Sequence, residues 1–481
     1  MTLQQAYQWV AQQLPGTRTH IHTHAHLQGD GNTVLASVST DSRTLAPGAL
    51  FVALKGERFD AHDFLAQAGL QQQVAAVIAE RLPEKFSKPA LIVPNTLHAL
   101  GALARGWRQQ FTLPVIAVTG SNGKTTVKEM IASILAAADG ESGRLATQGN
   151  LNNEIGVPLT LLRLTAAHRH AVVELGMNHV GEIATLAAFT QATVALVNNA
   201  QREHQEFMQS VEAVARENGC VISALAADGI AVFPADDAYT PIWRTLAGSR
   251  QVIDFALHST AAVTGYYKPD GAGVQLKMFT PAGDIECCLQ ALGEHNVRNA
   301  LAATACAIAA GISRDAIRTG LTNFQPVKGR LQYKSTANQV TVIDDTYNAN
   351  PDSVRAAIDV LASTQTQTTA RLLVLGDMGE VGDQGPQFHR EIGTYARSKG
   401  IETLLTTGDL MRDAVQTFNK NQSQHKQHAQ HFDTIEALIK ATQEKLHPGM
   451  TVLVKGSRFM RMERVVQALL EEPAKEQKET H

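Results

Sequence analysis

Several features that would assign the chain to a specialised class are scarce in its sequence. Only four of the 481 residues are cysteines, and none of them forms a C-x-x-C pair. Neither a disulfide framework nor a thiolate zinc site is therefore expected. The net charge is −3 and aromatic residues make up 5% of the chain. This composition excludes the basic surface and the stacking side chains typical of nucleic-acid-binding proteins.

Long apolar runs are also missing. The longest weakly polar run, residues 299–312, is shorter than the roughly 18 apolar residues of a membrane span, so it predicts a buried helix. The first residues lack both the basic and the apolar region of a secretion signal. We expect a cytoplasmic protein with no stable membrane insertion and no nucleic-acid partner.

The length predicts about three domains. Apolar runs alternate with helical patterns, which is typical of α/β domains with mostly parallel sheets. We predict an α/β fold of three domains: residues 1–86, a central P-loop parallel-sheet domain over 87–325, and a doubly wound, Rossmann-like domain over 326–481. The Gln/His-rich residues 422–431 and the charged residues 471–481 are expected to be solvated surface. The expected strands are residues 50–54, 74–79, 90–93, 114–119, 171–175, 193–197, 340–343, 371–375, 403–406 and 451–454.

The strongest motif is TGSNGKTT at residues 119–126, which lies between an apolar strand and an amphipathic helix. Backbone N–H groups at the start of such a helix bind phosphate, and a lysine can reach the terminal phosphates. Val118 stands where the longer P-loop pattern has its first glycine, so a glycine-rich turn with an exposed lysine is the alternative. We predict a nucleoside triphosphate site formed by Gly120, Ser121, Asn122, Gly123, Lys124, Thr125 and Thr126.

Two further polar residues follow apolar strands of the central domain. Glu174 ends one strand and His204 follows the next, so both could hold a metal ion beside the phosphates. Taken singly, Glu174 could equally be a structural salt-bridge partner, and His204 a surface residue.

Three clusters of polar residues remain open between a ligand site and local structure. Residues 40–43 (TDSR) suit a phosphate or ribose, or an Asx-turn. The amides of residues 150–153 suit a polar uncharged ligand, or a helix cap. Residues 344–351 (DDTYNANP) suit a ligand clamp, or an N-terminal helix cap.

The chain resembles the Mur ligases, the ATP-dependent amide-forming enzymes of peptidoglycan synthesis. The resemblance runs through all three predicted domains. Within the family, YNANP at 347–351 is similar to the form in the branch that adds a dipeptide, and the D-N-P-R signature of the diaminopimelate-adding branch is absent. The motifs that carry the resemblance are TGSNGKTT (119–126), VELGMNHVGEI (173–183), GEHNVRNALAA (293–303), GRLQY (329–333), DDTYNANPDSVRAAI (344–358), LGDMGEVG (375–382) and LVKGSRFMRME (453–463).

The resemblance implies a reaction and its participants. ATP would phosphorylate the carboxylate of UDP-N-acetylmuramoyl-tripeptide, and the amine of D-alanyl-D-alanine would attack the acyl phosphate. The protein is expected to be a monomer. The first domain would bind the UDP-linked substrate, the central domain ATP, and the third domain the dipeptide and part of ATP.

The resemblance also implies a role for each matching residue. Lys124, Glu174 and His204 would be catalytic, and Thr125, Glu174 and His204 would hold Mg²⁺. The ATP site would further include His295, Asn296, Asn299, Arg330, Asp345 and Asn348. The substrates would be bound by Thr40, Asp41, Ser42, Arg43, Asn150, Asn152, Asn153 and Asn350.

One position departs from the family pattern. Many Mur ligases have a carbamylated lysine that binds a second metal ion, and this chain has Asn218 there. Either Glu217 replaces that group, or a second metal ion is held more loosely. Two other functions stay open: another amide ligase of the superfamily, such as a folylpolyglutamate synthase or a single-amino-acid adder, and a nucleotide-dependent binding or switch protein that has lost catalysis.

Overall fold

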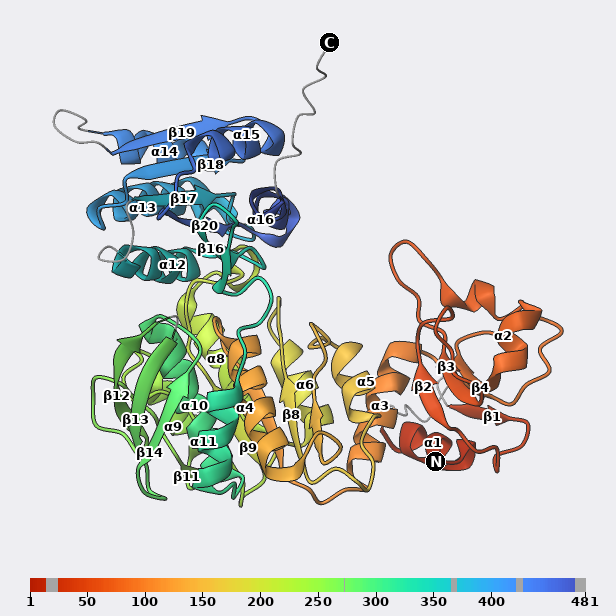
Figure 1. The fold of residues 1–481 in the computed structure, drawn as a ribbon. Helices are drawn as coiled ribbons and strands as arrows, with labels where there is room; N and C mark the ends of the chain where they lie inside the picture. The colour runs from red at the N-terminus through yellow and green to blue at the C-terminus, as the bar shows by residue number, and fades with distance from the viewer. Residues whose placement is uncertain (14–24, 272, 365–369, 421–426, 472–481) are drawn as a thin grey trace, which may run out of the picture.

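The computed structural model describes residues 1–481 except 14–24, 272, 365–369, 421–426 and 472–481. The strands of the described residues form four sheets, which are distributed over three α/β domains (Figure 1). The predicted fold class is confirmed. Among the helices of the described residues, none is both long enough and apolar enough to cross a membrane.

The N-terminal domain contains a five-stranded sheet in the order β1-β5-β4-β3-β2. Its last strand in sequence, Ala90–Ile92, was expected in the central domain, but it pairs with Val77–Ala79 of β4. The first sheet therefore continues past residue 86, because these apolar residues are buried against the neighbouring strand. The elements are α1 (Leu3–Gln13), β1 (His26–Gln28), β2 (Ser37–Ser39), β3 (Ala49–Val52), η1 (Ala61–Phe64), α2 (Ala68–Gln73), β4 (Val74–Ala79), β5 (Ala90–Ile92) and α3 (Thr96–Arg108).

The central domain is built on a six-stranded parallel sheet in the order β11-β10-β9-β6-β8-β7. Strand β6 lies inside this sheet and is buried along its whole length, so its end delivers the glycine-rich motif to the sheet's carboxyl edge. The elements are β6 (Val115–Thr119), α4 (Lys124–Asp139), β7 (Arg144–Ala146), α5 (Gly156–Leu161), β8 (His170–Glu174), α6 (Glu182–Thr190), β9 (Val194–Val197), α7 (Gln205–Met208), α8 (Val211–Ser223), β10 (Ile230–Val232), α9 (Thr240–Ala247) and β11 (Gln251–Val252).

A second, antiparallel sheet follows in the same domain and was not predicted. Its strands are β12 (Thr264–Asp270), β13 (Gly273–Phe279) and β14 (Ile285–Leu289). The buried side chains of β13 pack into the core that also holds α4, α10 (Glu294–Ala309) and α11 (Arg314–Asn323). Helix α10 contains most of the run expected as a buried helix, and that prediction is confirmed.

The third domain contains a six-stranded sheet in the order β15-β16-β20-β17-β18-β19, parallel except for β15. Residues 428–431, expected as solvated surface, belong to β19, because this edge strand buries Ala429 and pairs with β18. Residues 421–426 and 472–481 lie outside the described part. The elements are β15 (Gln332–Ser335), β16 (Thr341–Asp345), α12 (Pro351–Ser363), β17 (Arg371–Leu375), η3 (Gly382–Gln384), α13 (Gly385–Ser398), β18 (Thr403–Thr407), α14 (Met411–Asn419), β19 (His428–Phe432), α15 (Ile435–Lys445), β20 (Thr451–Lys455), η4 (Arg458–Met460) and α16 (Glu463–Leu470).

Candidate functional site

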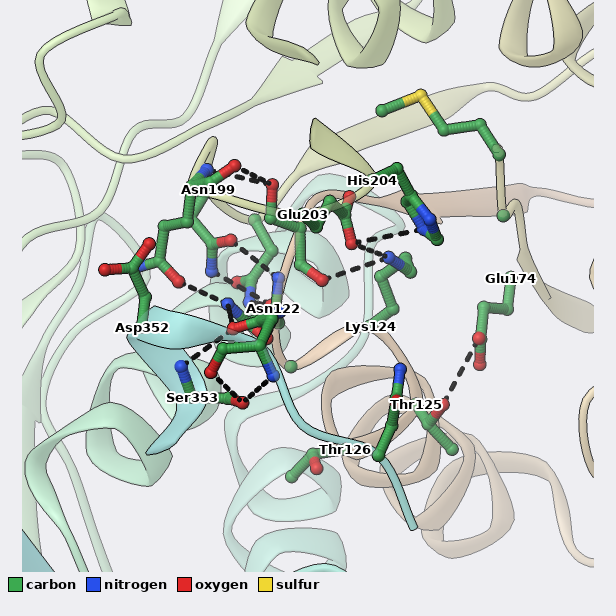
Figure 2. A pocket seen from close by; sticks show the side chains of 18 of the residues that line it. Asn122, Lys124, Thr125, Thr126, Glu174, Asn199, Glu203, His204, Asp352 and Ser353 are labelled. Carbon is green, nitrogen blue, oxygen red and sulfur yellow. Dashed lines mark hydrogen bonds and ion pairs between the residues drawn. The ribbon is translucent and has the colours of Figure 1, made fainter. Parts of the chain in front are cut away.

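A cavity of about 1160 Å³ lies between the central and third domains, at the carboxyl ends of the central strands. Its wall combines the glycine-rich loop, the ends of β8 and β9, the start of α10 and the loop that leads into α12. Figure 2 shows side chains from both domains directed toward one another in this space. Ligands of parallel α/β domains bind at this edge of the sheet, so the cavity is the candidate active site.

The glycine-rich loop has the backbone geometry of a phosphate site. Gly123 has a φ of +82° and directly precedes α4, whose first N–H groups face the cavity. A Cβ atom at this position would lie 2.5 Å from Asn299 Oδ1 and 2.7 Å from Asn198 Nδ2, so only glycine fits. The N-terminus of a 16-residue helix adds a favourable potential for an anion.

Lys124 folds back onto the loop that carries it. Its ammonium group donates hydrogen bonds to Gly120 O at 2.5 Å and to Ser121 O at 3.1 Å. It also forms an ion pair of 3.1 Å with Glu203 Oε2, and this carboxylate is buried in the cavity wall. Burial raises the pKa of Glu203 above its usual range, although Lys124 opposes the shift. A phosphate in the loop would compete with these oxygens for the lysine.

The side chains of Thr125 and Glu174 are in contact at the edge of the central sheet. The hydroxyl of Thr125 lies 3.2 Å from Glu174 Oε1, which also accepts a hydrogen bond from Asn152 Nδ2 at 2.8 Å. Glu174 Oε2 is buried and has no hydrogen-bond partner among the described residues. Hydroxyl and carboxylate oxygens are the ligands that Mg²⁺ prefers, and Mg²⁺ usually takes only one or two carboxylates from the protein. The donor set therefore fits this ion.

His204 lines the same cavity but contacts a different partner. Its Nδ1 atom lies 2.6 Å from Glu380 Oε2 of the third domain, and its Nε2 atom lies 3.8 Å from Glu203 Oε2. The contact with His204 lowers the pKa of Glu380. Within the described ranges, no group of three His, Cys, Asp or Glu side chains is arranged to hold a metal ion. The protein thus brings Thr125 and Glu174 into contact and holds His204 against the third domain.

The three polar residues predicted on α10 lie together in the cavity wall. Asn198 Nδ2 donates to Asn299 Oδ1 at 3.0 Å, and Asn299 Nδ2 donates to Asn296 Oδ1 at 3.2 Å. Burial lowers the pKa of His295 to about 4, so its imidazole is neutral at pH 7. This wall presents uncharged donors and acceptors, which suit a nucleoside.

The third domain adds opposite charges to the far side of the cavity. Arg330 stacks on the ring of Tyr347 and donates from Nη2 to the hydroxyl of Thr125 at 3.0 Å. Lys455 Nζ lies 2.6 Å from Asp345 Oδ2 and 2.9 Å from the backbone oxygen of Asn348. Burial raises the pKa of Asp345, against the attraction of Lys455. Arg330 therefore reaches the phosphate loop, and Asp345 and Asn348 line the same cavity.

Asn350 has two contacts at once. It caps α12 through a reciprocal pair of hydrogen bonds with Ser353, so the helix-cap interpretation is confirmed. Its Nδ2 atom also donates to Asn122 Oδ1 of the glycine-rich loop at 2.9 Å. The cap therefore joins the third domain to the phosphate loop.

The predicted substrate residues are only partly brought to the cavity. Residues 40–43 do not line it, and the Asp41 side chain instead accepts from the N–H of Arg43 and pairs with its guanidinium. This contact lowers the pKa of Asp41 to about 2. Asn152 and Asn153 line the cavity, whereas Asn150 does not. Asn153 also caps α5 by accepting from the N–H of Gly156 at 2.9 Å.

Of the two alternatives for the position of Asn218, the one in which Glu217 replaces a carbamylated lysine disagrees with the contacts of Glu217. Glu217 Oε1 accepts from the N–H of Ile183, at the start of α6, and the residue does not line the cavity. Asn218 Oδ1 accepts from the hydroxyl of Thr119 at 2.6 Å and from the N–H of Gly120 at 3.1 Å. Asn218 thus holds the end of β6 and the glycine-rich loop, and Glu217 holds the start of α6.

Comparison with protein families agrees with this geometry over three segments of the chain. The Mur ligase middle domain matches residues 118–307, the Mur ligase glutamate ligase domain matches residues 329–458, and the catalytic domain of the Mur ligase family matches residues 34–108. The first two of these segments, residues 118–307 and 329–458, line the cavity from opposite domains.

Individual proteins are similar over nearly the whole length. The chain is 42% identical over 452 residues to UDP-N-acetylmuramoyl-tripeptide--D-alanyl-D-alanine ligase of Escherichia coli (strain K12), which covers 92% of this chain and 96% of that protein. The crystal structure of MurF from Acinetobacter baumannii superimposes with a TM-score of 0.85 at 35% identity, covering 98% of this chain and 99% of that one. MurF of Thermotoga maritima in complex with ADP has a TM-score of 0.77 at 25% identity, covering 90% and 96%.

Proposed function

The chain belongs to the Mur ligase family, and we propose that within it this protein joins D-alanyl-D-alanine to UDP-N-acetylmuramoyl-tripeptide. The products are UDP-N-acetylmuramoyl-pentapeptide, ADP and phosphate, in the synthesis of peptidoglycan precursors. The observation that carries this proposal is the shared cavity, where a phosphate loop from one domain faces Arg330, Asp345 and Lys455 from another. A site divided in this way suits a reaction that must align a nucleotide with two further substrates.

A carboxylate is a poor acyl donor, so the first step activates it. The terminal carboxylate oxygen of the tripeptide attacks the γ-phosphorus of ATP, a new P–O bond forms, and the bond to the β-phosphate oxygen breaks. The α4 N-terminus, Lys124 and Arg330 surround this position and neutralise the charge that builds on the transferred group. Lys124 must exchange its contact with Glu203 for a contact with phosphate.

The second step forms the amide. The free amine of D-alanyl-D-alanine attacks the acyl carbon, its C–N bond forms, the bond from carbon to the phosphate oxygen breaks, and the amine loses a proton. We propose that Asn350 contacts the dipeptide, and that Asp345 and Asn348 contact ATP or the dipeptide. His295, Asn296 and Asn299 contact the uncharged part of the nucleotide.

Mg²⁺ is proposed at the oxygens of Thr125 and Glu174, with His204 as a further ligand. Bound there, it would neutralise phosphate charge and polarise the transferred group. The unpartnered Glu174 Oε2 atom supports this assignment.

We also propose the remaining substrate contacts, the cellular compartment and the oligomeric state. We propose that Thr40, Asp41, Ser42 and Arg43 hold the UDP end, and that Asn150, Asn152 and Asn153 hold the muramoyl side. The free state of all four cysteines fits a reducing compartment, so we propose the cytoplasm. We also propose a monomer, which sedimentation would test.

The proposed function is tested by measuring phosphate release with ATP, Mg²⁺ and UDP-N-acetylmuramoyl-tripeptide. We expect release only when D-alanyl-D-alanine is added, and little when a single amino acid replaces it. Release that depends on a single amino acid would identify another amide ligase. No release under any of these conditions, with nucleotide binding intact, would indicate a binding protein.

A further inference from the structure

In the loop after β9, consecutive residues contact the phosphate loop and the third domain in turn. Gln201 accepts from Asn122 Nδ2 at 2.5 Å and donates its N–H to the hydroxyl of Ser121, so it holds the phosphate loop. Glu203 holds the phosphate loop as well, through its ion pair with Lys124. Arg202, which lies between them, and His204, which follows them, contact the third domain instead. Figure 2 shows Glu203 and Lys124 side by side in the cavity.

Arg202 makes the strongest of these contacts with the third domain. Its guanidinium donates to Asp352 Oδ1 at 2.7 Å and to Glu391 Oε2 at 2.8 Å, so it bridges the start of α12 and the middle of α13. Its backbone N–H also donates to Asp352 Oδ2 at 2.9 Å, and the guanidinium lies 5.2 Å from the ring centre of Phe388. All three charged side chains are at least partly shielded from water, which makes such a pair stronger than one on the open surface.

The loop is also held in an uncommon backbone conformation. His204 has a φ of +49°, which residues other than glycine rarely adopt. Its ring contacts Glu380, and the backbone N–H of Glu206 lies 3.4 Å from Glu380 O. Contacts with the third domain therefore accompany the conformation that turns the loop back after Glu203.

We propose that residues 201–204 couple the phosphate loop to the third domain, and that Arg202 is the positioning residue of this coupling. A phosphate that draws Lys124 away removes the ion-pair partner of Glu203, which is one residue of this short loop. The neighbouring Arg202 transmits that change to α12 and α13, and His204 transmits it to Glu380 in the loop after β17. Helix α12 begins directly after Asn350, the proposed dipeptide contact. Nucleotide and dipeptide should then strengthen each other's binding.

This inference rests on the proposed function for the identity of its second ligand, so its test has two parts. The first part measures the dissociation constant of Mg²⁺ and a non-hydrolysable ATP analogue by calorimetry, without and with UDP-N-acetylmuramoyl-tripeptide plus D-alanyl-D-alanine. We expect the two substrates to tighten analogue binding at least about fivefold in the wild type. In Arg202→Met this ratio falls to near one, whereas Arg202→Lys keeps an intermediate value.

The matched control is Arg216→Met, which removes an exposed arginine that pairs with Glu212 on α8. It should keep the wild-type ratio. Asp352→Asn removes the same bridge from the other domain, so its effect should not add to that of Arg202→Met in the double variant. Additive effects, or an unchanged ratio in Arg202→Met, would overturn the proposal.

The second part needs no substrate. Small-angle scattering of the ligand-free proteins should give a larger radius of gyration for Arg202→Met and Asp352→Asn than for the wild type and Arg216→Met. Equal radii would show that Arg202 does not hold the domains together. Turnover of the wild type with the dipeptide tests the proposed function separately. If the two substrates leave the dissociation constant of the ATP analogue unchanged in the wild type, the coupling is overturned whatever the turnover.

Discussion

The charges around Lys124 are the residue-scale basis of the proposed chemistry. In the structure the ammonium group is satisfied by two loop carbonyls and by Glu203. The same position lies between the α4 N-terminus and Arg330, where a transferred phosphoryl group would gather negative charge. Removing the lysine should therefore affect the reaction far more than the fold.

Replacing Lys124 by alanine should reduce turnover by about 100-fold to 1000-fold or more, a loss typical of removing one charge-stabilising donor. The thermal midpoint should stay within a few degrees of the wild type. Phosphate release and circular dichroism check the two expectations. Lys268→Ala, on the exposed side of β12, is the control and should keep full activity. An active Lys124→Ala enzyme would refute the role of this residue.

His295 provides a test by pH. Burial lowers its pKa to about 4, whereas the unfolded side chain titrates near 6.5. The unfolded state therefore binds a proton that the folded state does not, and stability is lost as the pH falls from about 6.5 toward 4. We expect this group to lower the free energy of unfolding by about 1–2 kcal/mol between pH 7 and pH 5.

Urea unfolding of the wild type and of His295→Asn at these two pH values measures that contribution. The variant should lose less stability than the wild type on acidification. Parallel losses in both proteins would mean that His295 is charged, or exposed, in the folded state.

Sequence alone was a good guide to residues whose role depends on a local motif. Lys124 and Thr125 were predicted from the glycine-rich motif and Glu174 from its position at the end of an apolar strand, and all three line the cavity. Glu203 was not identified, because its partner Lys124 is 79 positions away and nothing local marks a buried carboxylate. The only available signal was its position directly before His204.

At the scale of elements, the glycine-rich loop depends on a backbone that only glycine allows. Gly123 combines a positive φ with a neighbour only 2.5 Å from where its Cβ would lie. The contact is with Asn299, so a side chain here would push the loop away from α10. Both the loop and the polar side chains of α10 in the cavity wall would be displaced.

Gly123→Ala should weaken nucleotide binding by at least about tenfold, which corresponds to about 1.4 kcal/mol. Gly140→Ala is a closely matched control, because Gly140 follows the other end of α4, has a φ of +77° and has no atom within 4 Å of a built Cβ. It should lose some stability from backbone strain and keep its nucleotide affinity. Calorimetric titration with ADP compares them, and equal affinities would contradict the proposed loop geometry.

The cap of α12 provides the second prediction at this scale. Asn350→Ala should cost about 1 kcal/mol of stability, the usual cost of losing an N-cap, and should also raise the KM for the dipeptide. Thr434 caps α15 in the same domain, and its side chain likewise accepts from the third residue of the helix.

Thr434→Ala should therefore cost a similar amount of stability and leave the KM unchanged. Urea unfolding and steady-state kinetics separate the two effects. If both variants raised the KM equally, Asn350 would act only through domain stability.

Elements were predictable where one strand is an uninterrupted apolar run. Strands β4 and β17 have the residues expected from sequence, because both are largely buried and each pairs with a parallel strand on both sides. Strands β12 and β19 were missed, because each lies at a sheet edge and exposes polar side chains along it. The pairing that makes such segments strands comes from distant residues.

At the scale of the whole molecule, the candidate site is shared between two of the three domains. The central and third domains meet at one cavity, through Arg202 with Asp352, Asn122 with Asn350 and Arg330 with Thr125. None of these pairs is visible in sequence, since their members are 150 to 228 positions apart. The near-zero net charge is consistent with this arrangement, because a few cations are concentrated where anionic substrates would bind.

We propose above that this shared cavity activates a carboxylate with ATP and passes the acyl group to a dipeptide. The most direct test supplies UDP-N-acetylmuramoyl-tripeptide with ¹⁸O in its terminal carboxylate, together with ATP, Mg²⁺ and D-alanyl-D-alanine, and analyses the products by mass spectrometry. We predict UDP-N-acetylmuramoyl-pentapeptide and released phosphate that carries one ¹⁸O atom from the carboxylate. Phosphate without the label, or labelled tripeptide left unextended while ATP is consumed, would contradict this mechanism.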